Sequence, residues 1–213
     1  MSYDIDKDKV KVLEDFIFLH KKKPGAAASS VASVIGVLVG LKPSAVIDFN
    51  SDECLKFDEW EIIELFGNLG LKILAFKHKN SGIHMTDKTV DVFISRNQET
   101  AYKLHCEFEK LWSSMDALAQ IYDQKKWESA TREIGHLLGY PDTAIESFVN
   151  LNDEELNSDE RIARMERNRY FAHSAEHEEE ERETYDYVLN RAINELAPKT
   201  TEILKQNTTA SWV

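Results

Sequence analysis

The segment LKILAF, residues 71–76, contains a short apolar run between Lys72 and Lys77, and it decides the fold class. Its length and composition predict a buried strand rather than a helix. After a loop that contains Gly82, the segment TVDVFIS at residues 89–95 alternates apolar and polar side chains. That alternation predicts a second strand. These two strands set the chain apart from an all-helical protein.

Apolar residues at spacings of three and four predict that most of the remaining chain is helical. The longest such stripe covers residues 101–122, and another clean stripe covers residues 185–196. Shorter stripes predict helices at Val10, Leu13, Phe16 and Ile17; at Phe57, Trp60, Ile63 and Phe66; at Trp127, Ala130 and Ile134; and at Ile145, Phe148 and Val149.

The order of these elements predicts an α+β fold that is predominantly helical. We expect a small sheet or β-hairpin in the N-terminal half and a helical C-terminal half. The same order divides the chain into an α+β domain at residues 1–124 and a helical domain at residues 125–197. A polar C-terminal tail would then occupy residues 198–213.

The bulk composition excludes several classes of protein. The 213 residues are 42% hydrophobic and 30% charged, as in an ordinary globular protein. A net charge of -12 argues against nucleic acid and anionic lipid as partners, because both are polyanions. The apolar residues 26–41 include three serines and are fewer than the ~20 of a membrane-spanning helix.

The cysteines and the N-terminus predict a cytoplasmic protein. Cys54 and Cys106 are far apart and form no CxxC pattern, which is typical of reduced thiols. The first residues, MSYDIDKDK, lack the apolar stretch of a secretory signal.

Two segments of the chain are similar to each other. GVLVGLKPSAVIDF (residues 36–49) and GHLLGYPDTAIESF (residues 135–148) share both glycines, a leucine, an alanine and the final phenylalanine. The pattern predicts a helix that ends at glycine, then a turn, then proline before the next element. For residues 44–49 the composition favours a strand and the similarity favours a short helix, and we prefer the helix.

The turn in the second segment resembles two known patterns. LLGYPDTA, residues 137–144, is similar to the glycine-rich turn of helix-hairpin-helix modules, which bind DNA phosphates, but it lacks their second glycine and is one residue shorter. LGYP also resembles a turn of the uncharacterised, largely archaeal family called domain of unknown function 483. Cysteines follow the turn in that family, whereas Thr143 and Ala144 follow it here, so the resemblance implies no thiolate chemistry and no established activity.

The segment YFAHSAEHEEEERE, residues 170–183, allows a metal site or a helix start. His173 and His177 would share one face of a continuous helix, with Glu181 a turn beyond, and this set suits zinc or another divalent metal. The alternative makes Ser174 the helix cap and places the glutamates in the first turns, where the helix dipole favours negative charge. We favour the cap, so a divalent metal cofactor is not favoured.

Two further sets of residues are candidate sites. His136, Glu133 and Tyr140 are candidates for acid/base catalysis, although helix surfaces commonly carry such pairs. Lysines next to a helix N-terminus offer cations and free N–H groups to an anion. The candidates for that anion site are Lys22, Lys23, Gly25 and Ser29.

The sequence therefore predicts a cytoplasmic binding or interaction protein without an assigned reaction. A protein partner or a homo-oligomer would fit this role. One alternative is a small metal-dependent enzyme that uses His173 and His177. A second alternative is a nucleic-acid-binding accessory protein built on the turn at Gly139.

Overall fold

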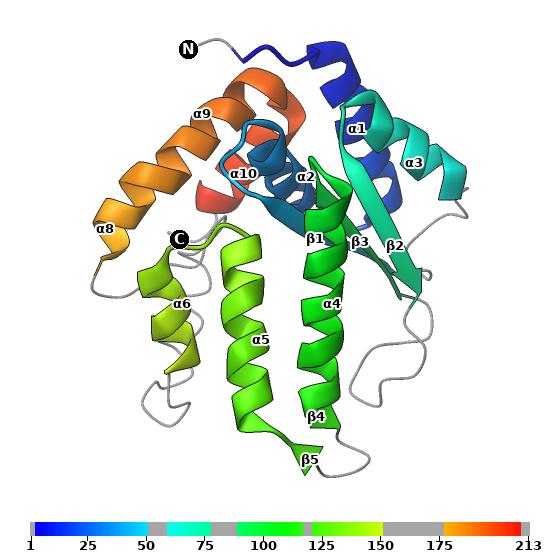
Figure 1. Ribbon diagram of the computed structural model, residues 1–213. Helices are drawn as coiled ribbons and strands as arrows, with labels where there is room; N and C mark the ends of the chain where they lie inside the picture. The colour runs from blue at the N-terminus through cyan, green and yellow to red at the C-terminus, as the bar shows by residue number, and fades with distance from the viewer. Residues whose placement is uncertain (1–2, 51–58, 78–88, 117–120, 151–176, 210–213) are drawn as a thin grey trace.

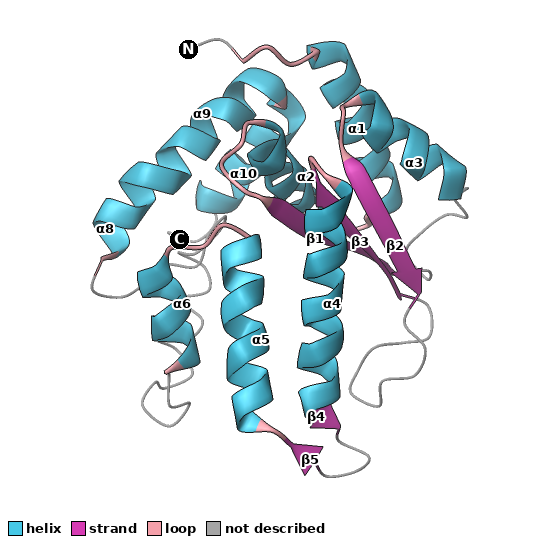
Figure 2. Ribbon diagram, viewed as in Figure 1, coloured by secondary structure: helices cyan, strands magenta, loops and turns pink. Residues whose placement is uncertain are grey.

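The computed structural model describes residues 3–50, 59–77, 89–116, 121–150 and 177–209. The chain is α+β and predominantly helical, as predicted, and its N-terminal half contributes a three-stranded sheet (Figures 1 and 2). In chain order the elements are α1 (Lys7–His20), α2 (Pro24–Leu38), β1 (Ser44–Asn50), α3 (Glu59–Asn68), β2 (Lys72–Lys77), β3 (Thr89–Ser95), α4 (Gln98–Ser114), β4 (Met115–Asp116), β5 (Ile121–Tyr122), α5 (Gln124–Leu137), α6 (Asp142–Val149), α8 (Glu178–Glu181), a π-helical turn (Arg182–Asp186), α9 (Tyr187–Leu196) and α10 (Pro198–Thr209).

The sheet has the order β1-β3-β2, and both pairings are antiparallel. The predicted strands are therefore confirmed as β2 and β3, with β3 in the centre. Side chains alternate between the two faces of β3: Val92 and Ile94 enter one core and Phe93 enters the other. The sheet is thus buried on both faces, which explains why its strands are so apolar.

Helices cover both faces of the sheet. The larger core joins α1, α2, α3 and α9 to one face, through residues such as Leu13, Ile35, Phe66 and Ile193. On the other face, Leu104 of α4 and Ile134 of α5 pack around Phe93. Figure 2 shows α4 lying across this second face.

Residues 44–49 form a strand, so the preferred prediction of a short helix is wrong. Ser44 to Asn50 pair in register with β3, from Ser44 opposite Ser95 to Asn50 opposite Thr89. Ala45, Ile47 and Phe49 alternate into the larger core. The edge of β3 supplies backbone partners here, and this tertiary pairing outweighs the local similarity to the second segment.

The predicted long helix over residues 101–122 ends earlier, at Ser114. The Oγ atoms of Ser113 and Ser114 donate to the carbonyls of Lys110 and Leu111 one turn back. Such local bonds compete with the helical pattern. The chain then reverses through β4 and β5, which pair with each other.

The C-terminal helices belong to the same core as the N-terminal half. Leu189 and Ile193 of α9 are buried beside residues of α1 and α2, and Figure 1 shows α10 next to α2. Residues 198–209, which belong to the predicted polar tail, form the helix α10. Across the predicted division at residue 124, α5 packs on α4.

In α3 and α6, some residues that were predicted to face the core are exposed to solvent. Trp60 and Ile63 of α3 are 73% and 47% exposed, and Phe148 of α6 is 55% exposed. Ile62 and Phe66 fill the inner face of α3 instead. Among the described residues, none of the helices has the length and apolar character needed to cross a membrane.

Candidate functional site

The two similar segments form corners of the same shape. We call residues 36–43 the first corner and residues 135–141 the second corner. Gly40 and Gly139 adopt left-handed φ values of 81° and 76°. Leu41 N–H donates to Gly36 O and Tyr140 N–H donates to Gly135 O, each at 2.9 Å. These bonds close the ends of α2 and α5 in the same way.

The two corners contact each other. A Cβ at Gly139 would lie 3.0 Å from Pro43 Cδ and 3.2 Å from Lys42 Cα. Ser44 Oγ, just beyond the first corner, donates to Leu137 O at 2.5 Å. Segments almost a hundred residues apart therefore lie backbone to backbone, and only glycine fits at this contact.

Lys42 is a buried cation at the junction of the corners. It is 5% exposed. Its stem lies against α2, where a Cβ at Gly36 would come within 3.1 Å of Lys42 Cγ and Cδ. Its Nζ lies 5.4 Å from the ring centroid of Tyr140. The side chain therefore spans from the first corner to the second.

Burial lowers the pKa of Lys42 from 10.5 to about 8, and the negative charge of Asp186 opposes this shift. Burial disfavours the ammonium form, because the interior replaces water poorly around a charge. Burial also raises the pKa of the neighbouring Tyr140 hydroxyl. At neutral pH the junction therefore holds a protonated lysine beside a neutral tyrosine.

Asp186 supplies the opposite charge from the C-terminal region. It is 5% exposed and is the last residue of the π-helical turn. Its Oδ2 lies 3.9 Å from Arg182 Nε. Such turns are uncommon insertions in α-helices and often coincide with special sites.

A second buried carboxylate connects the same segment to α6. Glu181 is 5% exposed and accepts a hydrogen bond from Thr143 Oγ1. Thr143 itself is exposed, and we call Lys42, Tyr140, Glu181 and Asp186 the interior cluster. It joins both corners to residues 181–186, which lie about forty residues or more away in sequence from either corner.

The interior cluster has groups that could act in chemistry, since an amine with a pKa near 8 can serve as a base or nucleophile. However, Lys42 and Asp186 are both 5% exposed, so a substrate would have to open the fold to reach them. A buried charge pair is also a common structural device. The geometry favours a structural role for this cluster.

A pocket of about 410 Å³ lies at the C-terminal end of α2, beside Leu38, and is partly open to solvent. Its apolar walls are Ile5, Leu38, Leu69 and Leu71. The start of α1 and the turn between α3 and β2 lie at the same end of the molecule (Figure 1). Segments from four parts of the chain therefore meet around one hollow.

Arg96 is one of the two cations that line this pocket, together with Lys9. Its Nε donates to Val37 O at 3.0 Å, and its Nη2 donates to Leu38 O. The guanidinium also lies against Gly40, where a Cβ would be 3.4 Å from Nη1. The last carbonyls of α2 therefore hold Arg96 in place, at the negative end of the helix dipole.

Asp4 and Asp6 are the acids of this pocket, and Lys9 also lines it. Asp6 Oδ1 accepts the N–H groups of Asp8 and Lys9 at 3.0 and 3.3 Å and so caps α1. Asp6 Oδ2 lies 4.0 Å from Lys9 Nζ. Asp4 is exposed in the segment that precedes this cap.

The predicted catalytic residues are close in sequence, and each side chain contacts a different neighbour. Glu133 Oε2 lies 2.8 Å from Lys103 Nζ, and this contact lowers the pKa of Glu133. His136 is exposed, with its Nδ1 3.3 Å from Asp142 Oδ1. Tyr140 instead turns into the interior cluster. Each of the three candidates therefore has a different neighbour.

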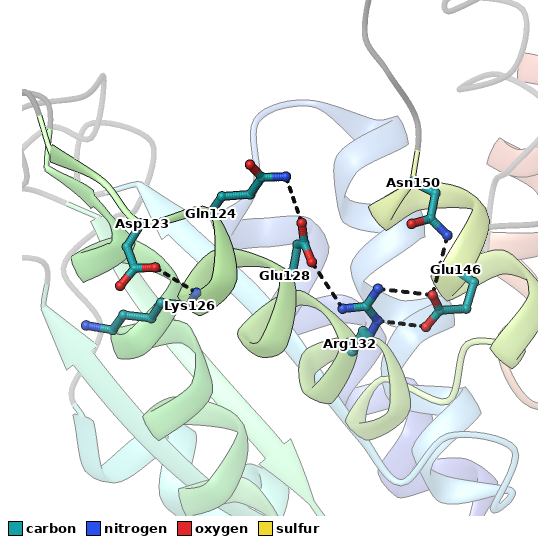
Figure 3. Close-up of polar contacts among 7 residues, drawn as sticks. All are labelled: Asp123, Gln124, Lys126, Glu128, Arg132, Glu146 and Asn150. Carbon is teal, nitrogen blue, oxygen red and sulfur yellow. Dashed lines mark hydrogen bonds and ion pairs between the residues drawn. The ribbon is translucent and has the colours of Figure 1, made fainter.

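An exposed polar network next to these residues holds α5 against α6. Arg132 Nε and Nη2 donate to the two carboxylate oxygens of Glu146 at 2.7 and 3.1 Å (Figure 3). Glu128 contacts the same guanidinium at 3.6 Å. This two-point contact fixes the angle between the helices and so positions the second corner.

The predicted anion-site residues surround the start of α2. Lys22, Lys23 and Ser29 are exposed, and Gly25 lies in the first turn. The neighbouring Lys21 is buried instead, with its Nζ 3.3 Å from Asp48 Oδ1. The anion site therefore stays a prediction.

The metal prediction falls partly outside the described residues. His173 and the proposed cap Ser174 lie outside them. His177 is exposed just before α8, while Glu181 is buried and bound to Thr143. Within the described part of the chain, no group of three or more histidine, cysteine or acidic side chains could hold a metal ion.

The sequence reasoning missed Lys42, Asp186, Arg96 and Asp4. A signal for Lys42 was present: the first corner has one residue more than the second between its glycine and its proline. That extra residue is part of the Leu41–Lys42 pair, where the second corner has Tyr140 alone. No comparable signal marks Arg96, because its role depends on the position of α2.

No protein-family model, curated protein or solved structure matches the chain. The resemblance of the LGYP turn to domain of unknown function 483 therefore stays a prediction. The function must be inferred from the geometry of the chain itself.

Proposed function

We propose that this chain is a cytoplasmic binding protein whose ligand site is the pocket beside Arg96. The observation that carries this proposal is the fixed guanidinium of Arg96, which two carbonyls at the end of α2 hold at the pocket wall. A group held in this way loses little entropy when a ligand arrives.

The size and the lining of the pocket support the same proposal. A volume of about 410 Å³ falls within the range of ~300–1,000 Å³ that is typical of small-molecule sites. Aliphatic walls with a few charged groups are the usual composition of such sites. The half-open shape favours a small, weakly bound ligand over a large cofactor.

A blocked pocket tests the proposal. We would record amide NMR spectra of the full chain with a varied set of small polar fragments. Asn68→Trp places a large ring on an exposed residue of the pocket wall, and Lys125→Trp is the matched exposed control on α5. Fragments should shift the amides of Leu69, Gly70 and Arg96 in the control but not in the blocked variant. Shifts that the blocked variant retains, or no shifts at all, would contradict the proposal.

A protein partner or a second copy of the chain is the second candidate function. Trp60 and Ile63 lie one turn apart on α3 and are 73% and 47% exposed. Exposed apolar groups of this size often mark contact surfaces. Sedimentation of the wild type and of Trp60→Lys at increasing concentration would test self-association.

The nucleic-acid alternative has less support. In the second corner, Gly139 N–H and Tyr140 N–H already donate to carbonyls of α5, at 3.0 and 2.9 Å. Gly139 also packs against Pro43. The groups that a helix-hairpin-helix turn would offer to a phosphate are therefore engaged inside the protein. A gel shift at low salt would test the alternative directly.

The metal-dependent enzyme also has less support, because Glu181 is already bound to Thr143. Elemental analysis of the purified protein would test it. If the wild type contains stoichiometric zinc and the His177→Ala variant does not, this result would support the metal-dependent enzyme.

A further inference from the structure

The pocket beside Arg96 carries charges of both signs on different segments of the chain. Arg96 lies where β3 leads into α4 and faces the end of α2. Asp4 and Asp6 lie on the segment that leads into α1. The acids and the arginine therefore approach the hollow from separate elements.

The arginine keeps donors for a ligand. A guanidinium has five N–H donors in a planar fork. Arg96 Nε and Nη2 donate to the carbonyls of Val37 and Leu38. Nη1 lies over Gly40, beside the chain rather than on a carbonyl partner. A carboxylate is the group that best matches such an edge.

The acids are suited to a cation. Asp6 Oδ1 is engaged as the cap of α1, and its Oδ2 is only 4.0 Å from Lys9 Nζ, which is a loose contact. Asp4 is exposed and lies two residues earlier in the same extended segment. An ammonium group could therefore be bound at this side without breaking a close ion pair.

The walls between the two charged sides are aliphatic. Ile5, Leu38, Leu69 and Leu71 all line the pocket. An aliphatic surface favours an aliphatic part of a ligand, because burial of both surfaces removes apolar area from water. The lining residues in the described part of the chain include no aromatic ring.

We propose that the pocket binds a small aliphatic zwitterion, such as a free aliphatic amino acid or a short aliphatic peptide. Its carboxylate would lie at Arg96, its ammonium group at Asp4 and Asp6, and its apolar part on the leucine walls. This inference rests on the proposed function and adds the chemical class of the ligand. An ion that carries only one sign of charge would be attracted to one side of the pocket and repelled by the other.

Three probes separate the contributions of the two charges. Leucine carries both charges, N-acetylleucine lacks the ammonium group, and leucinamide lacks the carboxylate. Each would be titrated into the full chain at pH 7 and constant ionic strength, with the amides of Ile5, Gly70, Leu71 and Arg96 as reporters. We expect leucine to bind with a Kd on the order of 1 mM. Each derivative should bind at least about tenfold more weakly.

Variants assign each charge of the ligand to its side of the pocket. Asp4→Asn should weaken leucine severalfold and leave N-acetylleucine unchanged, because the derivative has no ammonium group. Arg96→Gln should weaken leucine and leave leucinamide unchanged. Since Arg96 also holds the end of α2, the Asp4 variant keeps the test valid if the Arg96 variant fails to fold. Glu99→Gln, an exposed acid in the first turn of α4, is the control.

The outcomes distinguish this inference from the proposed function. If all three probes shift the reporter amides with equal affinity, the zwitterion proposal is refuted, but the pocket remains a ligand site. Failure of leucine and a two-residue aliphatic peptide to shift any reporter amide would also overturn it. The proposed function itself fails if the varied fragment set also leaves those amides unshifted, or if Asn68→Trp retains the shifts.

Discussion

Gly139 lies directly against Pro43, so that a Cβ at Gly139 would come within 3.0 Å of Pro43 Cδ and 3.2 Å of Leu41 O. The two corners with similar sequences are therefore partners in the tertiary structure. Each ends a helix with a glycine of left-handed φ, and each presents its backbone to the other. A close backbone contact of this kind requires glycine for two separate reasons, the φ angle and the space.

Substitution of Gly139 separates those two reasons. Gly139→Ala should destabilise the protein by roughly 2–4 kcal/mol, because a left-handed alanine costs about 1–2 kcal/mol and the methyl group also meets backbone atoms. Gly70→Ala has a similar φ of 74° but nothing within 4 Å of the new Cβ, so it should cost only about 1–2 kcal/mol. Urea denaturation of both variants measures the difference, and equal losses would show that the contact with Pro43 is unimportant.

Gly67→Ala completes this series. A Cβ at Gly67 meets nothing within 4 Å, and the residue lies in α3. Alanine favours a helix over glycine by about 0.5–1 kcal/mol, so this variant should be neutral or slightly more stable.

Lys42 and Asp186 should behave as a coupled pair. Lys42→Met keeps the buried stem but removes the charge that faces Asp186, and it should cost about 2–3 kcal/mol. Asp186→Asn should have a cost of similar size. The double variant should be more stable than the sum of the two losses predicts, because neither charge is then left alone in the interior. Additive losses in a double-mutant cycle would show that the two side chains act independently.

The stability of the protein should rise with pH through the range where Lys42 titrates. The folded-state pKa of Lys42 is about 8, whereas the unfolded-state pKa is near 10.5. Between these values the unfolded chain binds more protons than the folded chain, so the free energy of unfolding increases with pH. From pH 7 to pH 9.5 this contribution should be about 2 kcal/mol.

Lys42→Met is the reference for that pH measurement. Urea midpoints of the wild type and of the variant, compared at each pH, cancel the titration of other groups. The stability deficit of the variant should grow by about 2 kcal/mol from pH 7 to pH 9.5, because the wild type gains stability as Lys42 loses its proton in the folded state, whereas the variant has no group that titrates at this position. A difference that stays constant from pH 7 to pH 9.5 would refute the lowered pKa.

Glu14 should be important for the docking of α10. It is 1% exposed, and its Oε1 accepts Thr200 N–H in the first turn of α10 at 2.5 Å. Glu14→Ala should cost about 2–3 kcal/mol, because a buried N–H group loses a charged acceptor. Glu14→Gln keeps an acceptor oxygen and should cost less.

Asp15→Ala is the matched control for Glu14. Asp15 lies next to Glu14 on α1 and contacts Lys199 Nζ at 3.4 Å, but both side chains are about half exposed. Exposed ion pairs contribute little, so this variant should change the free energy of unfolding by less than about 1 kcal/mol. Similar losses for both variants would argue against a special role for the buried carboxylate.

Short-range patterns were sufficient for much of the fold. The strands β2 and β3 and the ends of α2 and α5 at Gly40 and Gly139 all follow from local composition. At the start of α4, Asn97 Oδ1 accepts the Thr100 N–H at 2.7 Å and so caps the helix. In each case the deciding partner lies within a few residues or the pattern repeats along one element.

The candidate sites depended on contacts between distant segments. Arg96 is a pocket residue because α2 ends beside it, and Lys42 is a charge-paired lysine because the π-helical turn places Asp186 in the same interior. The spacing of residues along the sequence predicts neither of these contacts. For the candidate pair His136 and Glu133, the structure likewise adds partners that local spacing does not reveal, Asp142 and Lys103, and the acid/base role stays a prediction.

By itself the sequence determined the class of the fold, the two strands of the hairpin and the glycine ends of the helices, because backbone propensity and hydrophobic period act over a few residues. The tertiary structure alone decided that residues 44–50 are a strand, that α9 and α10 complete the first core, and which charges are buried. Those outcomes depend on the free energy of burying one surface against another, and that surface is supplied by residues far away along the chain.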